Sequence, residues 1–434
     1  MRKERIKMEV TAYDRLGEAK YQLTLSNGLQ VILVPKQELS KTYAIFMTNY
    51  GSINRLFSPI GSEKMIEVPD GIAHFLEHKL FEKEDRDVFS DFLSQGASPN
   101  AFTSFTKTAY LFSTIENTYQ NVRTLLDFVQ EPYFSDASVE KEKGIISQEI
   151  HMYDDEPDWQ AFIGTIKNMF AEHPVRIDIL GTDDTIEHIT KEDLYTCYET
   201  FYHPSNMTLC IAGNFDEATM AEVIKENQAA KSFKKSEPIV RKFPNETNKV
   251  AVKEETITLP ISIPKVTIGI KESNEVIGRE AFLERDTLQH MLLDYFFSPG
   301  GPFYDELYKE GWIDDSFEFS TTVEESFSFS IISTNTQDTK ACGTKIIDML
   351  LRTKSITLTD ENVRLMKKRY IGEVLTAMNS PESIAIQTAH YHFMDIDFFS
   401  ILDYAESMTT EKVNQFLHQW IKEEAITMHR IEQE

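Results

Sequence analysis

Residues 69–81 read Pro-Asp-Gly-Ile-Ala-His-Phe-Leu-Glu-His-Lys-Leu-Phe, and this stretch predicts one helix that carries a metal site. Its apolar residues fall at helical spacing and are expected to face a core: Ile72, Phe75, Leu76 and Leu80. His74 and His78 lie four residues apart, so they project from one face of the helix, with Glu77 beside them. Two imidazoles one turn apart can grip a single Zn²⁺, and an adjacent carboxylate can accept a proton from water that the metal activates. This pattern is typical of a metallohydrolase.

A hydrolytic zinc site needs a third protein ligand, and the helix expected over 138–153 offers two candidates. We expect Ser138 to cap this helix at its N-terminus and Pro157 to follow its end. Glu142 and Glu149 lie seven residues apart, so they share a face. The spacing leaves open which carboxylate binds the metal and which one orients a ligand from behind.

The order His-x-x-Glu-His, from His74 to His78, is the inverzincin signature. Four further segments match the pattern of one family of such enzymes: Gln148-Glu149-Ile150, Ser98-Pro99-Asn100-Ala101-Phe102-Thr103, His173-Pro174 with Gly181-Thr182, and Tyr202-His203-Pro204-Ser205-Asn206-Met207. From near Leu25 to its C-terminus, the chain therefore resembles the pitrilysin and insulysin family of zinc peptidases, which includes the mitochondrial processing peptidases. Within that family it is most similar to a zinc-carrying subunit of two-subunit bacterial peptidases.

This resemblance implies a role for each residue of the site. It makes His74, His78 and Glu149 the ligands of Zn²⁺. Glu142 becomes a carboxylate that supports a ligand from behind. Glu77 becomes the general base, which takes a proton from water whose pKa the metal lowers to about 7, and which passes that proton to the leaving amine. Co²⁺ or Mn²⁺ could occupy the same donors, so the choice of zinc is an inference.

The segment from Asn100 to Thr103 is the expected substrate site. In the family, the corresponding segment is a sheet edge that receives the substrate as an added strand, so that main-chain hydrogen bonds hold an extended peptide. The resemblance therefore assigns substrate binding to Asn100, Ala101, Phe102 and Thr103. The residues alone also fit an ordinary junction between a turn and a strand.

One segment departs from the family pattern. Family members with a complete site carry Leu-Arg-Glu-x-Gly-x-x-Tyr, where this chain has Leu-Tyr-Lys-Glu-Gly-Trp-Ile-Asp over 307–314. Tyr308 thus replaces an Arg and Asp314 replaces a Tyr, a pair that binds substrate and stabilises the developing oxyanion. Losing one such donor costs about 10² to 10³ in rate. The simplest inference is a heterodimer in which a related zinc-free subunit supplies the Arg and Tyr, and a homodimer is less favoured.

Composition narrows the class of protein. The chain holds 44 Lys and Arg against 70 Asp and Glu, a formal net charge of −26 that disfavours nucleic acid and anionic membranes as partners. Residues 1–7 show no secretion signal, and no apolar run approaches the length of about 18 residues that a membrane span needs. We therefore expect a cytoplasmic protein. The three scattered cysteines argue against a disulfide framework or a thiolate zinc site.

The patterning predicts an α+β fold. Strands are expected on both sides of the Asn27-Gly28 turn and over 43–48, with a strand pair or one long strand over 102–113. Further helices are expected near 117–129 and 191–201. Thr190 and Thr409 open similar helix–strand units, and Ser138 and Thr359 open similar long helices, at offsets of about 220 residues. These offsets predict a duplication.

The resemblance implies two related α/β-sandwich domains, each an antiparallel-rich sheet with helices packed on it, enclosing a chamber. We expect a zinc-binding catalytic domain over 1–228, a linker over 229–254 and a related domain over 255–434. The copy of the metal helix would fall near Asp294, where no histidine pair occurs.

The sequence therefore favours a zinc endopeptidase subunit that acts on small or unfolded peptides. Non-catalytic subunits of respiratory complexes share the fold, so a peptide-binding or assembly subunit is the alternative. The intact metal motif argues against it, because a structural subunit has no need of such a site. A metallochaperone is less favoured still, because carrier sites use exposed soft ligands.

Overall fold

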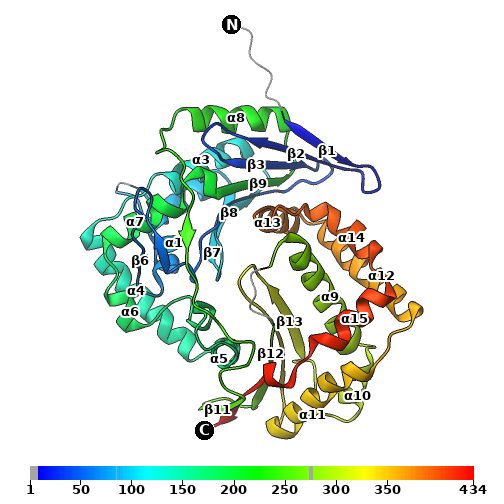
Figure 1. Ribbon diagram of the computed structural model, residues 1–434. Coiled ribbons are helices and arrows are strands. Elements are labelled where there is room, and N and C mark those ends of the chain that lie inside the picture. Colours follow the sequence, from blue (N-terminus) through cyan, green and yellow to red (C-terminus); the bar gives the residue numbers. More distant parts are fainter. Residues whose placement is uncertain (1–7, 85, 273–276) are drawn as a thin grey trace. The chain divides into compact units, whose positions relative to one another are not determined.

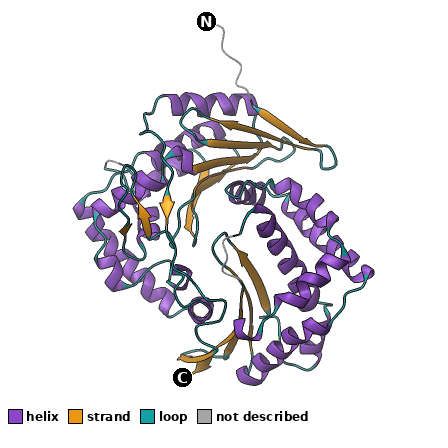
Figure 2. Cartoon of the chain, in the orientation of Figure 1, coloured by secondary structure: helices purple, strands orange, loops and turns teal. Residues whose placement is uncertain are grey.

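The computed structural model describes residues 8–84, 86–272 and 277–434. The chain divides into two compact units, each assembled from three stretches of sequence (Figure 1). Unit 1 comprises Met1–Gln148, Asp178–Lys242 and Leu375–Phe399, and unit 2 comprises Glu149–Ile177, Phe243–Val374 and Ser400–Glu434. Both units combine strands with helices, so the expected α+β class is confirmed (Figure 2).

Unit 1 is built on a seven-stranded sheet with the strand order β1-β2-β3-β9-β4-β8-β7. Its strands are β1 (Glu9–Tyr13), β2 (Glu18–Thr24), β3 (Gln30–Pro35), β4 (Thr42–Thr48), β7 (Ala97–Thr103), β8 (Thr108–Thr114) and β9 (Met207–Gly213). The Asn27-Gly28 turn joins the antiparallel strands β2 and β3, and Gly28 takes the positive φ of 90° that such turns require. β3 and β9 are parallel, while β7 pairs antiparallel with β8 at one end of the sheet. The expected strand pair over 102–113 is thus the hairpin β7–β8.

Helices and a small second sheet complete unit 1. The small sheet has the order β10 (Val240–Arg241), β5 (Leu56–Ser58) and β6 (Ile66–Glu67). The helices are α1 (Ile72–Phe81), α2 (Val88–Ser94), α3 (Thr118–Gln130), α4 (Asp136–Asp154), α6 (Asp183–Glu187), α7 (Lys191–Phe201), α8 (Glu217–Ala229) and α13 (Pro381–His392). α1 packs on β7, β8, α3 and α7, so the helix with the histidine pair lies beside the edge of the large sheet. The boundary between the units falls inside α4, between Gln148 and Glu149.

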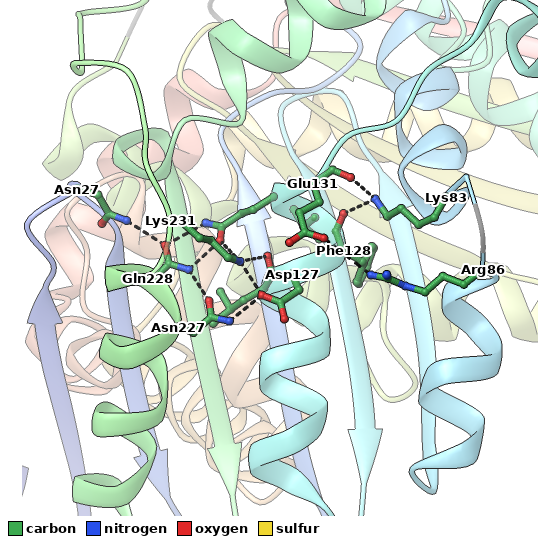
Figure 3. A network of polar contacts seen from close by, with 12 residues as sticks. Asn27, Lys83, Arg86, Asp127, Phe128, Glu131, Asn227, Gln228 and Lys231 are labelled. Atoms are coloured by element: carbon green, nitrogen blue, oxygen red, sulfur yellow. Dashed lines mark hydrogen bonds and ion pairs between the residues drawn. The ribbon is translucent and has the colours of Figure 1, made fainter.

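A polar network holds the end of α1 against the C-terminal end of α3 (Figure 3). Lys83 donates hydrogen bonds to the main-chain oxygens of Phe128 (2.7 Å) and Glu131 (2.5 Å), which have no partners within the helix. Burial lowers the pKa of Lys83 to about 8. Lys231, just beyond α8, contacts Asp127 at 2.8 Å on the same helix end. Because cations stabilise a helix C-terminus, this network fixes α1, α3 and α8 to one another.

Unit 2 contains a five-stranded sheet with the order β11-β15-β12-β14-β13. Its strands are β11 (Glu254–Leu259), β12 (Lys265–Lys271), β13 (Glu318–Val323), β14 (Ser328–Asn335) and β15 (Ile426–Gln433). Its helices are α5 (Pro157–Met169), α9 (Arg279–Phe297), α10 (Pro302–Lys309), α11 (Thr339–Arg352), α12 (Asp360–Ala377), α14 (Ile401–Ser407) and α15 (Thr410–Trp420).

The two sheets repeat one topology. β3-β9-β4-β8-β7 in the first half of the sequence corresponds to β11-β15-β12-β14-β13 in the second, and the only parallel pairs are β3–β9 and β11–β15 among the described strands. Thr190 caps α7 before β9, and Thr409 caps α15 before β15. The repeat seen in the sequence therefore corresponds to two related sheets.

Each sheet is completed by a helix from the other half of the sequence. α13 packs on β4 and β9 of unit 1, and α5 packs on β12 and β15 of unit 2. Lys20 anchors the α13 segment through a 2.7 Å ion pair with Asp397, and Lys36 donates to the main-chain oxygen of Met378 at 3.1 Å. The division expected at 1–228, 229–254 and 255–434 stays a prediction about the repeats, as does the enclosed chamber.

The start of α4 differs from the expectation. Ser138 lies inside the first turn, and Ser135 is the capping residue, because its Oγ accepts from the backbone N–H of Ser138 at 3.2 Å. Ser138 Oγ in turn accepts from the backbone N–H of Ser135 at 3.2 Å. This reciprocal pair caps the helix one turn earlier than a single Ser in the sequence indicated.

Candidate metal centre

The N-terminus of α1 is fixed by two glycines. Gly71 has φ 88°, and a Cβ on it would lie 2.4 Å from the main-chain oxygen of Leu180. Gly181 has φ 77°, and a Cβ there would lie 2.7 Å from the main-chain oxygen of Asp70. Because only glycine fits such a close approach, the two segments lock together and set where α1 begins. The helix then buries its apolar face together with His74 and Glu77, each of which is 9% exposed.

The structure brings three of the residues selected from the sequence into one cluster. One ligand atom each from His74, His78 and Glu149 lies within 4.8 Å of the other two. α1 supplies both histidines, one turn apart, and α4 supplies Glu149. Two imidazole nitrogens and one carboxylate oxygen are the donor set of a hydrolytic zinc site, in which a fourth position stays open. The donor chemistry therefore fits Zn²⁺, while the role of these residues as ligands stays a prediction.

His74 lies in an environment that keeps its imidazole neutral. Burial, and to a smaller extent the neighbouring His78, lowers the pKa of His74 to about 3. The two imidazole rings lie 4.5 Å apart between centroids and are inclined by 63°. Because a histidine must be neutral to bind a metal, the burial of His74 favours the binding form at neutral pH.

Glu142 lies behind the cluster and contacts a candidate ligand. Its Oε1 is 3.1 Å from His78 Nδ1, which leaves Nε2 of that ring for a metal. Burial opposes ionisation of Glu142, but the hydrogen bond and charge of His78, with the charges of Lys79 and Lys141, hold its pKa below the ordinary value. Glu142 thus contacts His78 as a supporting carboxylate would, and that supporting role stays a prediction.

Lys79 is a buried cation that the sequence analysis did not select. Its side chain is fully buried, its Nζ lies 3.8 Å from Glu142 Oε2, and it also donates to Glu82 and to the main-chain oxygen of Ser138. The signal available in the sequence was that Lys79 follows Phe75 by four residues and Leu76 by three, which places it on the apolar face of the helix. Because Lys79 is buried beside Glu142, its positive charge compensates the charge of that carboxylate at a place that water does not solvate.

Glu77 contacts the predicted substrate segment. Thr103 Oγ1 donates a 2.6 Å hydrogen bond to Glu77 Oε2. Thr103 ends β7, which among the described strands pairs on one side only, with β8. Asn100 on the same strand is exposed, while Ala101 and Phe102 are half-buried. The four expected substrate residues therefore lie on a sheet edge beside Glu77, and their binding role stays a prediction.

The segment that departs from the family pattern lies in unit 2. Tyr308 is 55% exposed and stacks on Tyr304 with ring centroids 5.8 Å apart. The carboxylate of Asp314 accepts from Ser316 at its backbone N–H (2.9 Å) and at its hydroxyl (2.5 Å). These hydrogen bonds hold the pKa of Asp314 below its ordinary value. Asp314 therefore stabilises a local turn.

Comparison with known proteins shows which family the chain belongs to. Its residues 54–183 match the model of Insulinase (Peptidase family M16), and residues 188–370 match that of the Peptidase M16 inactive domain. It is 46% identical over 420 residues to a protein of Bacillus subtilis (strain 168) described as "Uncharacterized zinc protease YmfH", covering 96% of this chain and 98% of that one. The chain belongs to the M16 family. Its resemblance to zinc peptidases of the insulinase and pitrilysin type is thereby confirmed.

The chain is similar to two further proteins. A crystal structure of an M16-like peptidase from Alicyclobacillus acidocaldarius superposes with a TM-score of 0.92 at 38% identity, covering 96% of this chain and 99% of that one. A mitochondrial-processing peptidase subunit beta of Arabidopsis thaliana is 28% identical over 171 residues, which cover 38% of this chain and 32% of the relative. No helix in the described ranges has both the length and the hydropathy that a membrane span requires.

Proposed function

We propose that this chain is a zinc-dependent endopeptidase subunit that hydrolyses small or unfolded peptides. The observation that carries the proposal is the convergence of His74, His78 and Glu149 within 4.8 Å, with Glu77 in the same helical turn. Bound by these residues, Zn²⁺ would polarise the scissile carbonyl and lower the pKa of the attacking water. A binding protein without catalysis has no need of a general base at that position.

The chain's own residues supply the proton transfers. The carboxylate of Glu77 accepts a proton from water as the water oxygen bonds to the carbonyl carbon of the peptide. The same carboxylate then gives the proton to the amine nitrogen as the C–N bond breaks. Glu142, through His78 Nδ1, holds that imidazole in one orientation, and the burial of His74 excludes water from its side of the site.

The substrate is proposed to bind as an extra strand on β7. The segment from Asn100 to Thr103 lies at the end of the seven-stranded sheet and has one edge without a partner strand among the described residues. Pro99 is tolerated in this strand because edge strands do not need every N–H. An added strand is held by main-chain hydrogen bonds, so peptides of many sequences fit if they are extended. This favours small or unfolded peptides over folded proteins.

A partner subunit is proposed to complete the site. Tyr308 and Asp314 stand where complete members carry an Arg and a Tyr, and Asp314 is engaged by Ser316. A related chain without the zinc motif would supply the missing oxyanion donors in a heterodimer, and a homodimer is less favoured because it would repeat the deficiency. The second candidate function is a non-catalytic peptide-binding or assembly subunit. The match of residues 188–370 to a model described as an inactive domain is compatible with it.

The test is peptidase activity on a quenched, unstructured peptide library. The zinc-loaded chain is assayed alone and with a related chain that lacks the zinc motif, and bound zinc is measured in each preparation. Glu77→Gln removes the general base while keeping the shape of the side chain. Glu140→Gln, at an exposed site on α4 away from the cluster, is the matched control for loss of a carboxylate.

Activity that needs the partner, disappears in Glu77→Gln and persists in Glu140→Gln would support the proposal. Full activity of the chain alone would show that the missing Arg and Tyr are replaced within it. Stoichiometric zinc without activity in either preparation would contradict the general-peptidase proposal and favour the binding subunit.

A further inference from the structure

A hydrogen bond joins the proposed substrate edge to the proposed proton acceptor. Thr103, the last residue of β7, donates from Oγ1 to Glu77 Oε2 at 2.6 Å. The strand that would hold the peptide and the carboxylate that would move the proton are therefore in direct contact. The inference below rests on the proposed function.

The direction of this hydrogen bond follows from the protons available. Thr108, opposite Thr103 in the β7–β8 pair, donates its own hydroxyl proton to the main-chain oxygen of Tyr50 at 2.9 Å. The two threonine hydroxyls are 3.5 Å apart, so the contact between them is weak. An ionised carboxylate only accepts hydrogen bonds. The one hydroxyl proton of Thr103 is therefore directed at Glu77.

Thr103 is carried by a rigid part of unit 1. The turn after it is closed by a 2.7 Å bond from Ser104 N to the main-chain oxygen of Lys107. Ser52 N donates to the main-chain oxygen of Ser104 at 3.1 Å, and Gly51 approaches so closely that a Cβ on it would lie 2.5 Å from that oxygen. This turn cannot shift without disturbing the segment it packs against, so the hydroxyl of Thr103 is preorganised.

We propose that Thr103 is the positioning residue of the general base. Its hydroxyl occupies Oε2 of Glu77 and holds the carboxylate in one rotamer, so that Oε1 accepts the proton from the attacking water. The proton then moves from Oε1 to the amine nitrogen as the peptide C–N bond breaks. Because Thr103 belongs to the strand that receives the peptide, the base is aligned with the scissile bond of a substrate bound on that strand.

The test compares Thr103→Val, which removes the hydroxyl at nearly constant shape, with Thr103→Ser, which keeps it. We expect kcat of the assembled peptidase to fall about tenfold to hundredfold in Thr103→Val with KM and zinc affinity unchanged, as for other residues that orient a functional group, and to recover in Thr103→Ser. Thr114→Val is the matched control. Thr114 lies at the other end of the same strand pair, and its hydroxyl contacts main-chain groups: the oxygens of Gly96 (3.2 Å) and Glu116 (2.6 Å), and the N–H of Glu116, from which it accepts at 3.3 Å.

Two further measurements separate this inference from the proposed function. In the Glu77→Gln background, Thr103→Val should cause no additional loss of rate. Crystal structures should show the Glu77 carboxylate displaced in Thr103→Val and in place in Thr103→Ser, a result that needs no activity. An undisplaced Glu77, an unchanged kcat, or a rise in KM alone would overturn the inference. If the wild-type assembly has no peptidase activity but Glu77 is displaced in crystals of Thr103→Val, the proposed function is contradicted. The inference that Thr103 positions Glu77 would then still hold.

Discussion

At the scale of single residues, we expect the contact between Glu142 and His78 to set how firmly the candidate ligands hold a metal. Glu142 fixes His78 through Nδ1 at 3.1 Å, and Lys79 lies on the other carboxylate oxygen at 3.8 Å. We expect Glu142→Ala to weaken zinc binding about tenfold to hundredfold, because the imidazole loses its orienting acceptor. The zinc affinity of Glu142→Gln should lie between that of Glu142→Ala and that of the wild type. Competition with a chromophoric chelator measures the affinity.

The matched control for Glu142 lies on the same helix. Glu140 is exposed and pairs with Lys143 at 2.7 Å, so Glu140→Ala removes a carboxylate from α4 without touching His78. It should bind zinc as the wild type does. Equal losses in Glu140→Ala and Glu142→Ala would mean that the charge of α4 matters and the contact does not.

His173 gives unit 2 a dependence on pH. This buried histidine accepts from Val175 N at 3.1 Å, at the start of the short 3-10 helix η1 (Pro174–Arg176), and its Nε2 lies 3.2 Å from Ser326 Oγ. Burial lowers its pKa from 6.5 to about 4, while the facing Glu246 raises it and Lys271 lowers it. The unfolded chain therefore binds a proton more readily, and stability is lost as pH falls from 6.5 towards 4.

Replacing His173 should reduce that loss. His173→Asn keeps a side-chain acceptor for the cap but does not titrate. This variant should be less stable than the wild type at pH 7. Between pH 7 and pH 4, its free energy of unfolding should fall by up to about 3 kcal/mol less than that of the wild type. Urea unfolding across this range measures both quantities. If the free energy of unfolding falls equally with pH in the two proteins, groups other than His173 cause the loss of stability in acid.

At this scale, the sequence predicted some residues of the candidate site but not the contacts between them. His74, Glu77 and His78 are readable because one helical turn brings them together, and the family pattern added Glu149 from a second helix. The hydrogen bond from Thr103 to Glu77 was not predictable, because it depends on how closely β7 approaches α1. Spacing within one element fixes a shared face, whereas contacts between elements depend on packing.

At the scale of elements, the packing of α5 on β15 requires a glycine. A Cβ on Gly164 would lie 2.6 Å from ring atoms of His429, which is buried and held by Glu255 at 3.1 Å. Because this imidazole is buried and already contacts Glu255, Gly164→Ala should destabilise the protein by about 1–3 kcal/mol. Gly372→Ala on α12 is the control, because nothing lies within 4 Å of its Cβ. That variant should be stabilised by about 0.5–1 kcal/mol.

Urea unfolding of the two variants measures these opposite shifts. A destabilised Gly372→Ala would mean that alanine is not tolerated in these helices in general. A neutral Gly164→Ala would mean that α5 can move away from β15 without cost, contrary to the close contact.

Elements themselves were largely readable from local patterns. The Asn27-Gly28 turn predicted the hairpin of β2 and β3, and the strand expected over 43–48 is β4. The start of α4 was misplaced because Ser135 and Ser138 cap it together. The partners of α5 and α13 were not readable, because an apolar helix face shows that the helix packs but does not show on which sheet.

At the scale of the whole molecule, the exchanged helices make each half of the sequence incomplete. α13 covers β4 and β9 with buried side chains that include Ile384, which is fully buried, although it lies in the second half of the chain. α5 completes the sheet of unit 2 although it lies in the first half. A contiguous half therefore exposes apolar surface that the intact chain buries, and that loss is comparable with the stability of a domain.

Cutting the chain between Lys242 and Phe243, where the sequence passes from unit 1 to unit 2, tests this dependence. Fragments 1–242 and 243–434 should each lack native near-ultraviolet circular dichroism alone, and should regain it as a 1:1 complex when refolded together. Ile384→Asp in the second fragment should prevent assembly, since it places a charge against the sheet of unit 1. Glu382→Gln, an exposed change on the same helix, should not. Cooperative folding of 1–242 alone would contradict the prediction, because that fragment would then be stable without α13.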